Sequence, residues 1–293
     1  MSAVATIGFF DGVHRGHQFL FAELNRHAVE LDCKPLIITF LQHPQQVINH
    51  HCPPLLTTLN EREHLLDQYG DAHFLDFQAV QPLTAADFLD YLADRWRVKY
   101  LIMGYNHCFG SDDLTTDVEY ETTASQFGIT IIRSPKLDID GAAPSSTRIR
   151  RLIQGGDIMA ANNLLGYDYC LTGVVQHGNG LGQKMGFPTA NLLIPEFKLL
   201  PPEGVYAGWV EMPIADHNAE LTQHAAPALI NIGTNPTVGN NHLSVEVHIP
   251  DYQGGELYGK TLFVHLKRFI RNEQTFPSLE ALRLQMLKDK KSL

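Results

Sequence analysis

The sequence predicts an α/β domain with a doubly wound parallel sheet, followed by an antiparallel β domain with a terminal helix. In the first half, short apolar runs alternate with helical stretches of about 10–15 residues, which is typical of a parallel sheet. After about Asp168, apolar and polar residues alternate with a period of two, which is typical of half-buried strands. The length of 293 residues fits two ordinary domains. We expect them to span residues 1–166 and 167–293.

The elements of the first half follow from apolar runs and helix-capping patterns. We expect a helix that starts after the first strand and extends to about Leu31. Thr58 to Glu61 forms a capping-box pattern that begins a further helix, and Gly70 is expected to close it. A helix from Thr84 to Trp96 has Thr84 as its expected N-cap. Five apolar runs are the candidate strands: Val4–Phe9, Pro35–Phe40, Ala72–Phe77, Tyr100–Met103 and Ile129–Arg133.

The elements of the second half follow from β-forming residues and from the alternating pattern. A helical segment from Asp157 to Leu165 precedes the expected boundary. Tyr169 to His177 is rich in β-forming residues, and the segments 243–249 and 262–267 alternate apolar with polar side chains. Ser278 begins an amphipathic helix at the end of the chain. This half is therefore expected to be an antiparallel barrel or sandwich with a terminal helix.

Composition excludes several classes of function. The net charge is −10 and there is no basic stripe, which argues against nucleic-acid binding, although a local site can still bind a nucleotide. No run of about 18 apolar residues and no secretory signal pattern is present, so we expect no membrane-spanning helix. Four cysteines lie far apart without a Cys-x-x-Cys pair: Cys33, Cys52, Cys108 and Cys170. This spacing argues against structural zinc and indicates reduced thiols in the cytoplasm.

The first candidate site is a phosphate site after the first strand. His14 and His17 lie three residues apart at a helix start, close to Asp11. If Gly16 begins the helix, both imidazoles can turn toward one anionic ligand, to which the helix N-terminus offers free N–H groups. Gly12 and Gly16 permit a close approach of the backbone. Metal binding or plain surface histidines are the alternatives, but the placement after a strand and between glycines favours a phosphate.

Two further segments belong to the same expected site. In the segment Pro144 to Arg150, one of the two serines is a natural N-cap. Arg150 lies one turn beyond Ser146, so hydroxyls and a guanidinium can converge on a phosphate. The polar loop Gly104 to Gly110, which contains Asn106, follows the fourth strand, where ligands bind in such sheets. The alternatives are an ordinary capped helix and a plain turn.

The second candidate site lies in the β half. Gly178 to Gly182 is rich in glycine but no helix start follows, so a flap over phosphates fits better than a dinucleotide-binding turn. Thr189 and Asn191 can offer a hydroxyl and a carbonyl oxygen to magnesium or to phosphate-bound water. Glu246 lies on the polar face of an alternating strand, where it could accept a proton from an attacking hydroxyl. Turn chemistry and a solvated glutamate are the alternatives.

Both sites resemble those of known families. Gly8 to His17, Thr39 to Pro44 and Ser145 to Arg150 resemble signatures of the flavin adenylyltransferase branch of the His-x-Gly-His nucleotidyltransferases. Gly178 to Asn191 is similar to the glycine flap and Pro-Thr-Ala-Asn motif of riboflavin kinases. Further segments extend this second resemblance: Asn231–Thr237, Val245–His248 with Asp251 and Tyr252, Leu257–Gly259, and Arg271–Phe276. In this order the two halves resemble the bifunctional bacterial riboflavin kinase/FAD synthetase family over nearly the whole chain.

The resemblance implies a nucleotidyltransferase domain, a kinase barrel and two Mg²⁺-dependent reactions. Riboflavin takes the γ-phosphate of ATP to give FMN, and the FMN phosphate then attacks the α-phosphate of a second ATP to give FAD and pyrophosphate. The implied catalytic residues are Glu246, His14, His17 and Arg150, and the implied Mg²⁺ ligands are Thr189 and Asn191. The implied nucleotide- or flavin-binding residues are Gly8, Phe10, Asp11, Gly16, Asn106, Ser146, Thr147, Gly178, Gly182, Pro188, Thr189, Asn191, Asn231 and Arg271. ATP, riboflavin and FMN are thus the expected partners of a monomer or weak homo-oligomer.

Three positions depart from the family pattern: Pro144, Asn106 and Leu41-Gln42. They leave open a riboflavin kinase whose first half is weakened or uses another nucleotide. A flavin-binding protein without catalysis is a third reading, and the presence of Glu246, Thr189 and Asn191 argues against it.

Overall fold

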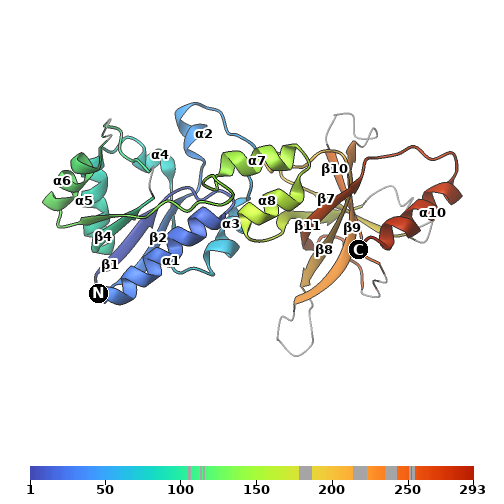
Figure 1. Ribbon diagram of the computed structural model, residues 1–293, viewed down its shortest axis with the longest axis horizontal. Helices are drawn as coiled ribbons and strands as arrows, with labels where there is room; N and C mark the ends of the chain where they lie inside the picture. Colours follow the sequence, from blue (N-terminus) through green and yellow to red (C-terminus); the bar gives the residue numbers. More distant parts are fainter. Residues whose placement is uncertain are drawn as a thin grey trace. The chain divides into compact units, whose positions relative to one another are not determined.

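The computed structural model describes residues 1–104, 107–112, 114, 116–177, 187–213, 223–234, 243–250, 252 and 255–293. The chain forms two compact units, Met1–Ser146 and Thr147–Leu293. Figure 1 shows an α/β arrangement in the first and a barrel in the second.

The first unit contains a parallel five-stranded sheet with the strand order β3-β2-β1-β4-β5. All five strands expected from apolar runs are present, with slightly different ends. Their bounds are Ala3–Ile7 for β1, Lys34–Phe40 for β2, Ala72–Leu75 for β3, Val98–Met103 for β4 and Thr130–Arg133 for β5. The helices of this unit are α1 (Arg15–Glu30), α2 (Pro44–Ile48), α3 (Leu59–Leu66), α4 (Phe77–Val80), α5 (Ala85–Trp96) and α6 (Asp117–Gln126).

The sheet is buried on both faces, as expected for a doubly wound fold. Alternate residues of the central strand enter two separate core clusters, so that Ala5 packs on one face and Val4 on the other. Phe88 and Leu92 of α5 belong to the first cluster, whereas α1 contributes Leu24 to the second. Central strands covered on both sides read as continuous apolar runs, which is why they were recognisable from sequence.

Threonine capping boxes begin three helices of the first unit. The predicted boxes at Thr58 and Thr84 are both present, and Thr116 begins α6 in the same way. The expected end of α3 at Gly70 is wrong, because α3 ends at Leu66 and Asp67 is its C-cap. Gly70 has a φ of +144° in the turn before β3, so it serves the turn instead of the helix end.

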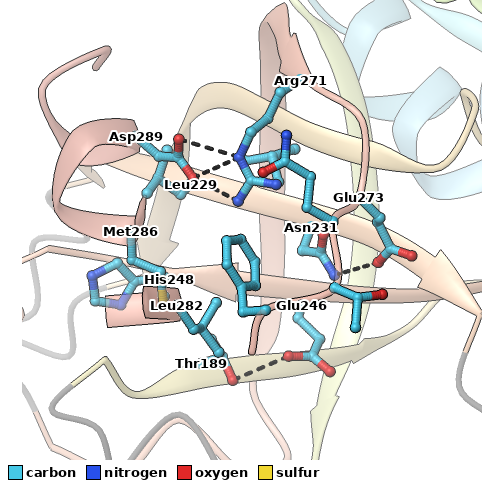
Figure 2. Close-up of a pocket in the computed structure, with 14 residues that line it drawn as sticks. Thr189, Leu229, Asn231, Glu246, His248, Arg271, Glu273, Leu282, Met286 and Asp289 are labelled. Carbon is cyan, nitrogen blue, oxygen red and sulfur yellow. Dashed lines mark hydrogen bonds and ion pairs between the residues drawn. The ribbon is translucent and has the colours of Figure 1, made fainter. Parts of the chain in front are cut away.

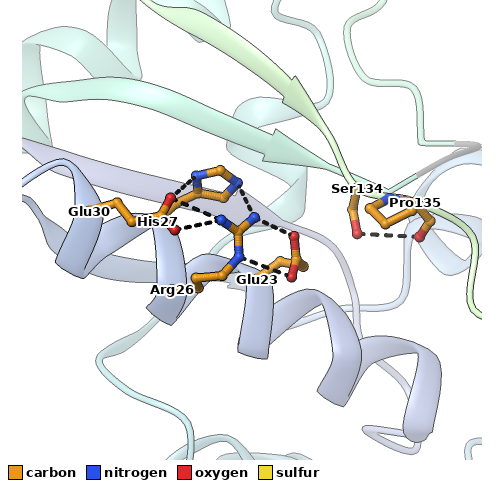
Figure 3. A network of polar contacts seen from close by, with 6 residues as sticks. All are labelled: Glu23, Arg26, His27, Glu30, Ser134 and Pro135. Atoms are coloured by element: carbon orange, nitrogen blue, oxygen red, sulfur yellow. Dashed lines mark hydrogen bonds and ion pairs between the residues drawn. The ribbon is translucent and has the colours of Figure 1, made fainter.

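The outer face of α1 carries a small ionic network (Figure 3). Arg26 pairs with Glu23 at 2.8 Å and with Glu30 at 2.7 Å, the spacings of neighbours on a helix surface. Hydrogen bonding to Arg26 lowers the pKa of Glu23. With 16 residues, α1 is the longest helix described, and in the described parts of the chain no helix is both long and apolar enough to cross a membrane.

The second unit is a closed antiparallel barrel of six strands, so the barrel interpretation is confirmed. The strands are β6 (Tyr169–Gln176), β7 (Thr189–Leu193), β8 (Gly204–Pro213), β9 (Gln223–Thr234), β10 (Leu243–His248) and β11 (Thr261–Arg271), ordered β10-β7-β6-β11-β8-β9. Helices α7 (Ser146–Gln154) and α8 (Ile158–Leu165) precede the barrel, and α10 (Leu279–Lys290) follows it. Ser278 caps α10, as predicted.

The alternation along β10 holds only in its centre. Val245 and Val247 are buried inside the barrel, and Glu246 between them is half-buried on the outer face. Leu243, expected on the apolar face, is exposed, and His248, expected on the polar face, is buried. His248 is covered because it packs against Phe187, with ring centroids 5.2 Å apart.

Candidate active sites

The loop after β1 is held in a compact shape by Asp11. Phe10, Gly12 and Val13 all have positive φ angles, so the chain turns sharply here. The buried carboxylate of Asp11 accepts hydrogen bonds from the backbone N–H groups of Leu56 and Thr57, at 3.1 and 3.0 Å. This carboxylate therefore fixes the loop to the segment before α3, a role that the sequence pattern did not indicate.

The two histidines of this loop lie in contact at the start of α1. The helix begins at Arg15 with His14 at the N-cap, one residue earlier than the start at Gly16 considered from sequence. The rings of His14 and His17 stack with centroids 3.6 Å apart and planes 19° apart. Both imidazoles therefore occupy the first turn of a helix that has no acidic residue there, which favours an anionic ligand.

Two glycines make room for this arrangement. A Cβ atom on Gly16 would lie 3.1 Å from Cε1 of His14, closer than an ordinary contact. A Cβ on Gly8 would lie 2.6 Å from the ring of Phe10, which in turn packs edge-on against His17 at 5.2 Å. Close packing around the histidine pair therefore requires glycine at positions 8 and 16.

The surroundings of the His17 imidazole favour its neutral form. Burial lowers its pKa well below 6.5, and the neighbouring His14 lowers it further. Its Nδ1 atom is buried, and among the described residues it has no hydrogen-bond partner. A neutral imidazole can donate one hydrogen bond to a phosphate oxygen without a fixed charge of its own.

Ser146 joins the start of α7 to the β1 loop. Its hydroxyl donates a 2.9 Å hydrogen bond to the carbonyl oxygen of Asp11, within the first unit. Thr147 and Arg150 follow on α7 and belong to the second unit, where Thr147 is exposed. Their expected part in phosphate binding remains a prediction.

The described residues of the loop after β4 are held by side chains from α6 and β5. Asn106 itself lies outside the described residues. Arg133 donates to the carbonyl oxygens of Gly104 and His107 at 3.1 and 3.0 Å. The hydroxyl of Tyr120 accepts from the N–H of Phe109 at 2.9 Å and donates to its carbonyl at 2.7 Å. These bonds hold Gly104, His107 and Phe109 beyond the end of β4, where the sequence analysis expects a ligand.

The second site is a pocket of about 450 Å³ on the outer face of the barrel (Figure 2). It lies between β7, β9 and β10, the segment after β11, and the helix α10. Its polar lining includes Thr189, Asn231, Glu246, His248, Arg271 and Glu273, and its apolar lining includes Val205, Leu229, Phe276, Leu282 and Met286. A pocket with both apolar and polar lining residues suits a ligand that combines a ring with polar groups.

Strand register brings three of the expected site residues together. Glu246 pairs with Asn191 of β7 on one side and with Asn231 of β9 on the other. Directly opposite residues of antiparallel strands share a face, so these three side chains stand in one row. The hydroxyl of Thr189 donates to the Glu246 carboxylate at 3.4 Å. Thr189, Asn191 and Glu246, which the sequence assigns to one site, therefore lie side by side, and their roles there remain a prediction.

The carboxylate of Glu246 is in a setting that favours its protonated form. Burial raises its pKa, the hydrogen bond from Thr189 lowers it, and the nearby charge of Glu273 raises it again. The net direction is upward. A carboxylate with a raised pKa accepts a proton more readily, which suits a general base.

Arg271 is engaged by a residue that sequence reasoning missed. Its Nη2 atom lies 2.7 Å from Oδ2 of Asp289 on α10, and Asp289 is only 3% exposed. The expected binding residue Arg271 is thus half of a buried ion pair at the pocket wall. Asn231 likewise donates to Glu273 at 3.0 Å. No local pattern marks Asp289, because its partner lies 18 residues away.

Pro188 precedes the pocket residue Thr189, and its carbonyl oxygen lies 2.9 Å from Nδ1 of His248. This contact requires the proton on Nδ1, because a carbonyl oxygen can only accept. Gly178 and Gly182, the expected flap residues, lie outside the described residues. Across the part of the chain that is described, no three His, Cys, Asp or Glu side chains are placed to hold a metal ion.

Comparisons with known proteins match both halves. A family model described as FAD synthetase matches residues 1–148, and one described as riboflavin kinase matches residues 165–293. The bifunctional riboflavin kinase/FMN adenylyltransferase of Escherichia coli K12 is 33% identical over 291 residues, which cover 98% of this chain and 90% of that protein. The protein of the same description from Bacillus subtilis is 30% identical over 297 residues, with 98% and 90% covered.

A solved structure is similar to this chain over nearly its whole length. It is described as a macrolide-efflux protein from Streptococcus pneumoniae, and it is 30% identical with a TM-score of 0.86. The match covers 99% of this chain and 93% of that one.

Proposed function

Because this chain belongs to the family of bifunctional riboflavin kinases/FMN adenylyltransferases and has both activities, we propose which of its residues perform each reaction. The row formed by Asn191, Glu246 and Asn231, with Thr189 beside it, is the observation that carries the assignment. Thr189, Asn231 and Glu246 line one pocket, which supports a candidate base beside candidate phosphate ligands.

In the kinase reaction, Glu246 takes the proton from the terminal hydroxyl of the ribityl chain. That oxygen then forms a bond to the γ-phosphorus of ATP, and the bond from this phosphorus to the β–γ bridging oxygen breaks, so that ADP leaves. The apolar side chains of the pocket contact the ring, and its polar side chains bind the ribityl chain. Since phosphoryl transfer depends mainly on positioning and charge neutralisation, one base and a phosphate-binding row are sufficient protein machinery.

The oxygen donors of β7 fit Mg²⁺. Thr189 and Asn191 occupy alternate positions of the strand, so a hydroxyl and an amide carbonyl share the face that bears Glu246. Mg²⁺ prefers oxygen ligands and is commonly held by few protein groups together with substrate phosphates and water. When bound there, it would neutralise charge on the phosphates of ATP.

In the adenylyl transfer, an FMN phosphate oxygen attacks the α-phosphorus of ATP, and pyrophosphate leaves as the α–β bridge breaks. No covalent enzyme intermediate is needed, because the FMN phosphate is already an ionised nucleophile. His14 and His17 at the N-terminus of α1 stabilise charge on the transferring phosphate. Gly8, Phe10, Asp11 and Gly16 shape this loop. We assign supporting roles to Asn106, Ser146, Thr147 and Arg150 from their sequence motifs.

Crossed substitutions test the division of labour. Glu246→Gln is expected to reduce FMN formation by about 10²- to 10⁴-fold, the usual contribution of a general base, and to leave FAD formation from supplied FMN intact. His17→Ala is expected to reduce FAD formation by about 10²-fold or more and to leave the kinase intact. His27→Ala, on the same helix, is the control. Loss of both activities in either folded variant contradicts the assignment.

Three further properties belong to the same proposal. Residues 1–166 and 167–293 are the functional domains, which separate expression of the two halves tests. The protein works in the cytoplasm, in keeping with its four cysteines, which form no disulfide with one another. It is a monomer or weak homo-oligomer, which light scattering at several protein concentrations can determine.

A further inference from the structure

The inward face of α10 lines the kinase pocket instead of a packed core. Leu282 and Met286, one turn apart on the helix, both line the pocket. Leu284 and Leu287 on the same helix are 53% and 41% exposed. Since α10 has few buried apolar side chains of its own, its position must depend on other contacts.

A buried ion pair supplies such a contact. The guanidinium of Arg271 reaches Oδ2 of Asp289 through Nε at 3.0 Å and through Nη2 at 2.7 Å. Gln285 donates to the other oxygen of Asp289 at 2.8 Å, and Nη1 of Arg271 donates to the carbonyl of Asn272. Every polar atom of the Asp289 carboxylate is thus engaged, as a buried charge requires. The pair ties the last turn of α10 to the last residue of β11.

The groups assigned to chemistry lie on a different wall of the pocket. Glu246 and Thr189 belong to β10 and β7, whereas Leu282, Met286 and Asp289 belong to α10 (Figure 2). A shift of α10 would therefore change the apolar space for a ring while the strands keep their register. A methionine on that wall can adapt to an aromatic ring and contact it favourably.

We propose that the Arg271–Asp289 pair positions α10 as the wall against which the flavin ring of riboflavin lies, and so sets the affinity for riboflavin. Asp289 is in this view a positioning residue and not a catalytic one. The inference rests on the kinase assignment given above, because it takes this pocket as the riboflavin site.

The test compares Asp289→Asn, Arg271→Gln and the double variant in the full-length protein. In Asp289→Asn, the KM for riboflavin is expected to rise about tenfold or more, with kcat and the KM for ATP within about twofold. In the double variant, the KM is expected not to exceed that of Asp289→Asn, because both buried charges are removed together. Glu280→Gln, an exposed carboxylate on the same helix, is the control and should leave all constants unchanged.

Two measurements separate this inference from folding defects and from the kinase assignment. Met286→Ala shortens the wall without touching the ion pair, and it should raise the KM for riboflavin several-fold, at unchanged kcat. An unchanged kcat for FMN formation, together with an unchanged urea-unfolding midpoint of the second unit, reports that the barrel is folded. A fall in kcat without a rise in the riboflavin KM, or single effects that multiply in the double variant, would overturn the inference. If Glu246→Gln retains FMN formation, the kinase assignment itself fails.

Discussion

Replacing Gly16 by alanine tests whether adenylyl transfer depends on the position of the His14 ring. The new Cβ would lie 3.1 Å from Cε1 and 3.2 Å from Nδ1 of His14, whereas ordinary contacts begin at 3.4 Å. The ring must therefore retreat by about 0.3 Å or more. The third neighbour, the carbonyl oxygen of Pro144, lies at 3.5 Å and can stay in place.

The size of the effect follows from this displacement. A misplacement of about 1 Å typically costs about 10²-fold in rate, so a few tenths of an ångström should cost about 3- to 10-fold in kcat for FAD formation. Ten-fold corresponds to about 1.4 kcal/mol in the activation free energy. The free energy of unfolding should rise by up to about 1 kcal/mol, because alanine has a higher helix propensity than glycine.

The assay measures FAD from supplied FMN and ATP, with FMN formation from riboflavin as the internal standard. Urea unfolding followed by fluorescence supplies the stability. A Gly16→Ala variant that forms FAD at the full rate would refute the reasoning, because a displaced His14 ring would then have no effect on adenylyl transfer. A loss of both stability and kinase activity would equally contradict it.

Two further predictions concern the loop after β4. Burial and the nearby Arg133 lower the pKa of His107 to about 4, whereas an unfolded histidine has a pKa of about 6.5. The neutral form thus stabilises the fold above pH 6.5, and this contribution is lost as the pH falls toward 4. Between pH 6.5 and 4.5, the free energy of unfolding of the wild type, measured in urea, should fall more steeply than that of His107→Gln, by up to about 1 kcal/mol per pH unit. Equal pH dependences of the two proteins would exclude this role. Tyr120→Phe removes the hydroxyl that bonds both backbone groups of Phe109, so unfolding free energy should drop by about 1–3 kcal/mol. Its KM for FMN or ATP should rise while the kinase is spared, and an unchanged unfolding midpoint would contradict the role given to this hydroxyl.

The strands and capped helices were predictable because their signals are local. The buried strands of the first unit are apolar runs, and Thr58 and Thr84 each stand three residues before an acid. Helix α6 has the same signal in Thr116 and Glu119, but its two threonines and weak amphipathic pattern hid it. Helix α2 has only five residues, too few for any periodicity.

The sequence indicates many residues of the candidate sites, but it does not indicate what each of them contacts. The period of two placed Glu246 on the outer face, and strand register then brought Asn191 and Asn231 beside it. The sequence does not indicate the hydrogen-bond partners of Asp11 and Arg271, because these partners lie 45 and 18 residues away in the chain. The burial of Asp289 depends on the same long-range pairing, so its sequence neighbours Lys288 and Lys290 suggest an exposed residue instead.

In the closed barrel, a single strand carries side chains that fill the interior and side chains that line the pocket. On β10, Val245 and Val247 fill the interior while Glu246 between them faces the pocket. Apart from the assigned base Glu246, side chains on the pocket face of the barrel can therefore change without disturbing the inward valines that fill its interior. A lineage carrying this fold can explore new ligands in small steps, each tolerated by the scaffold beneath.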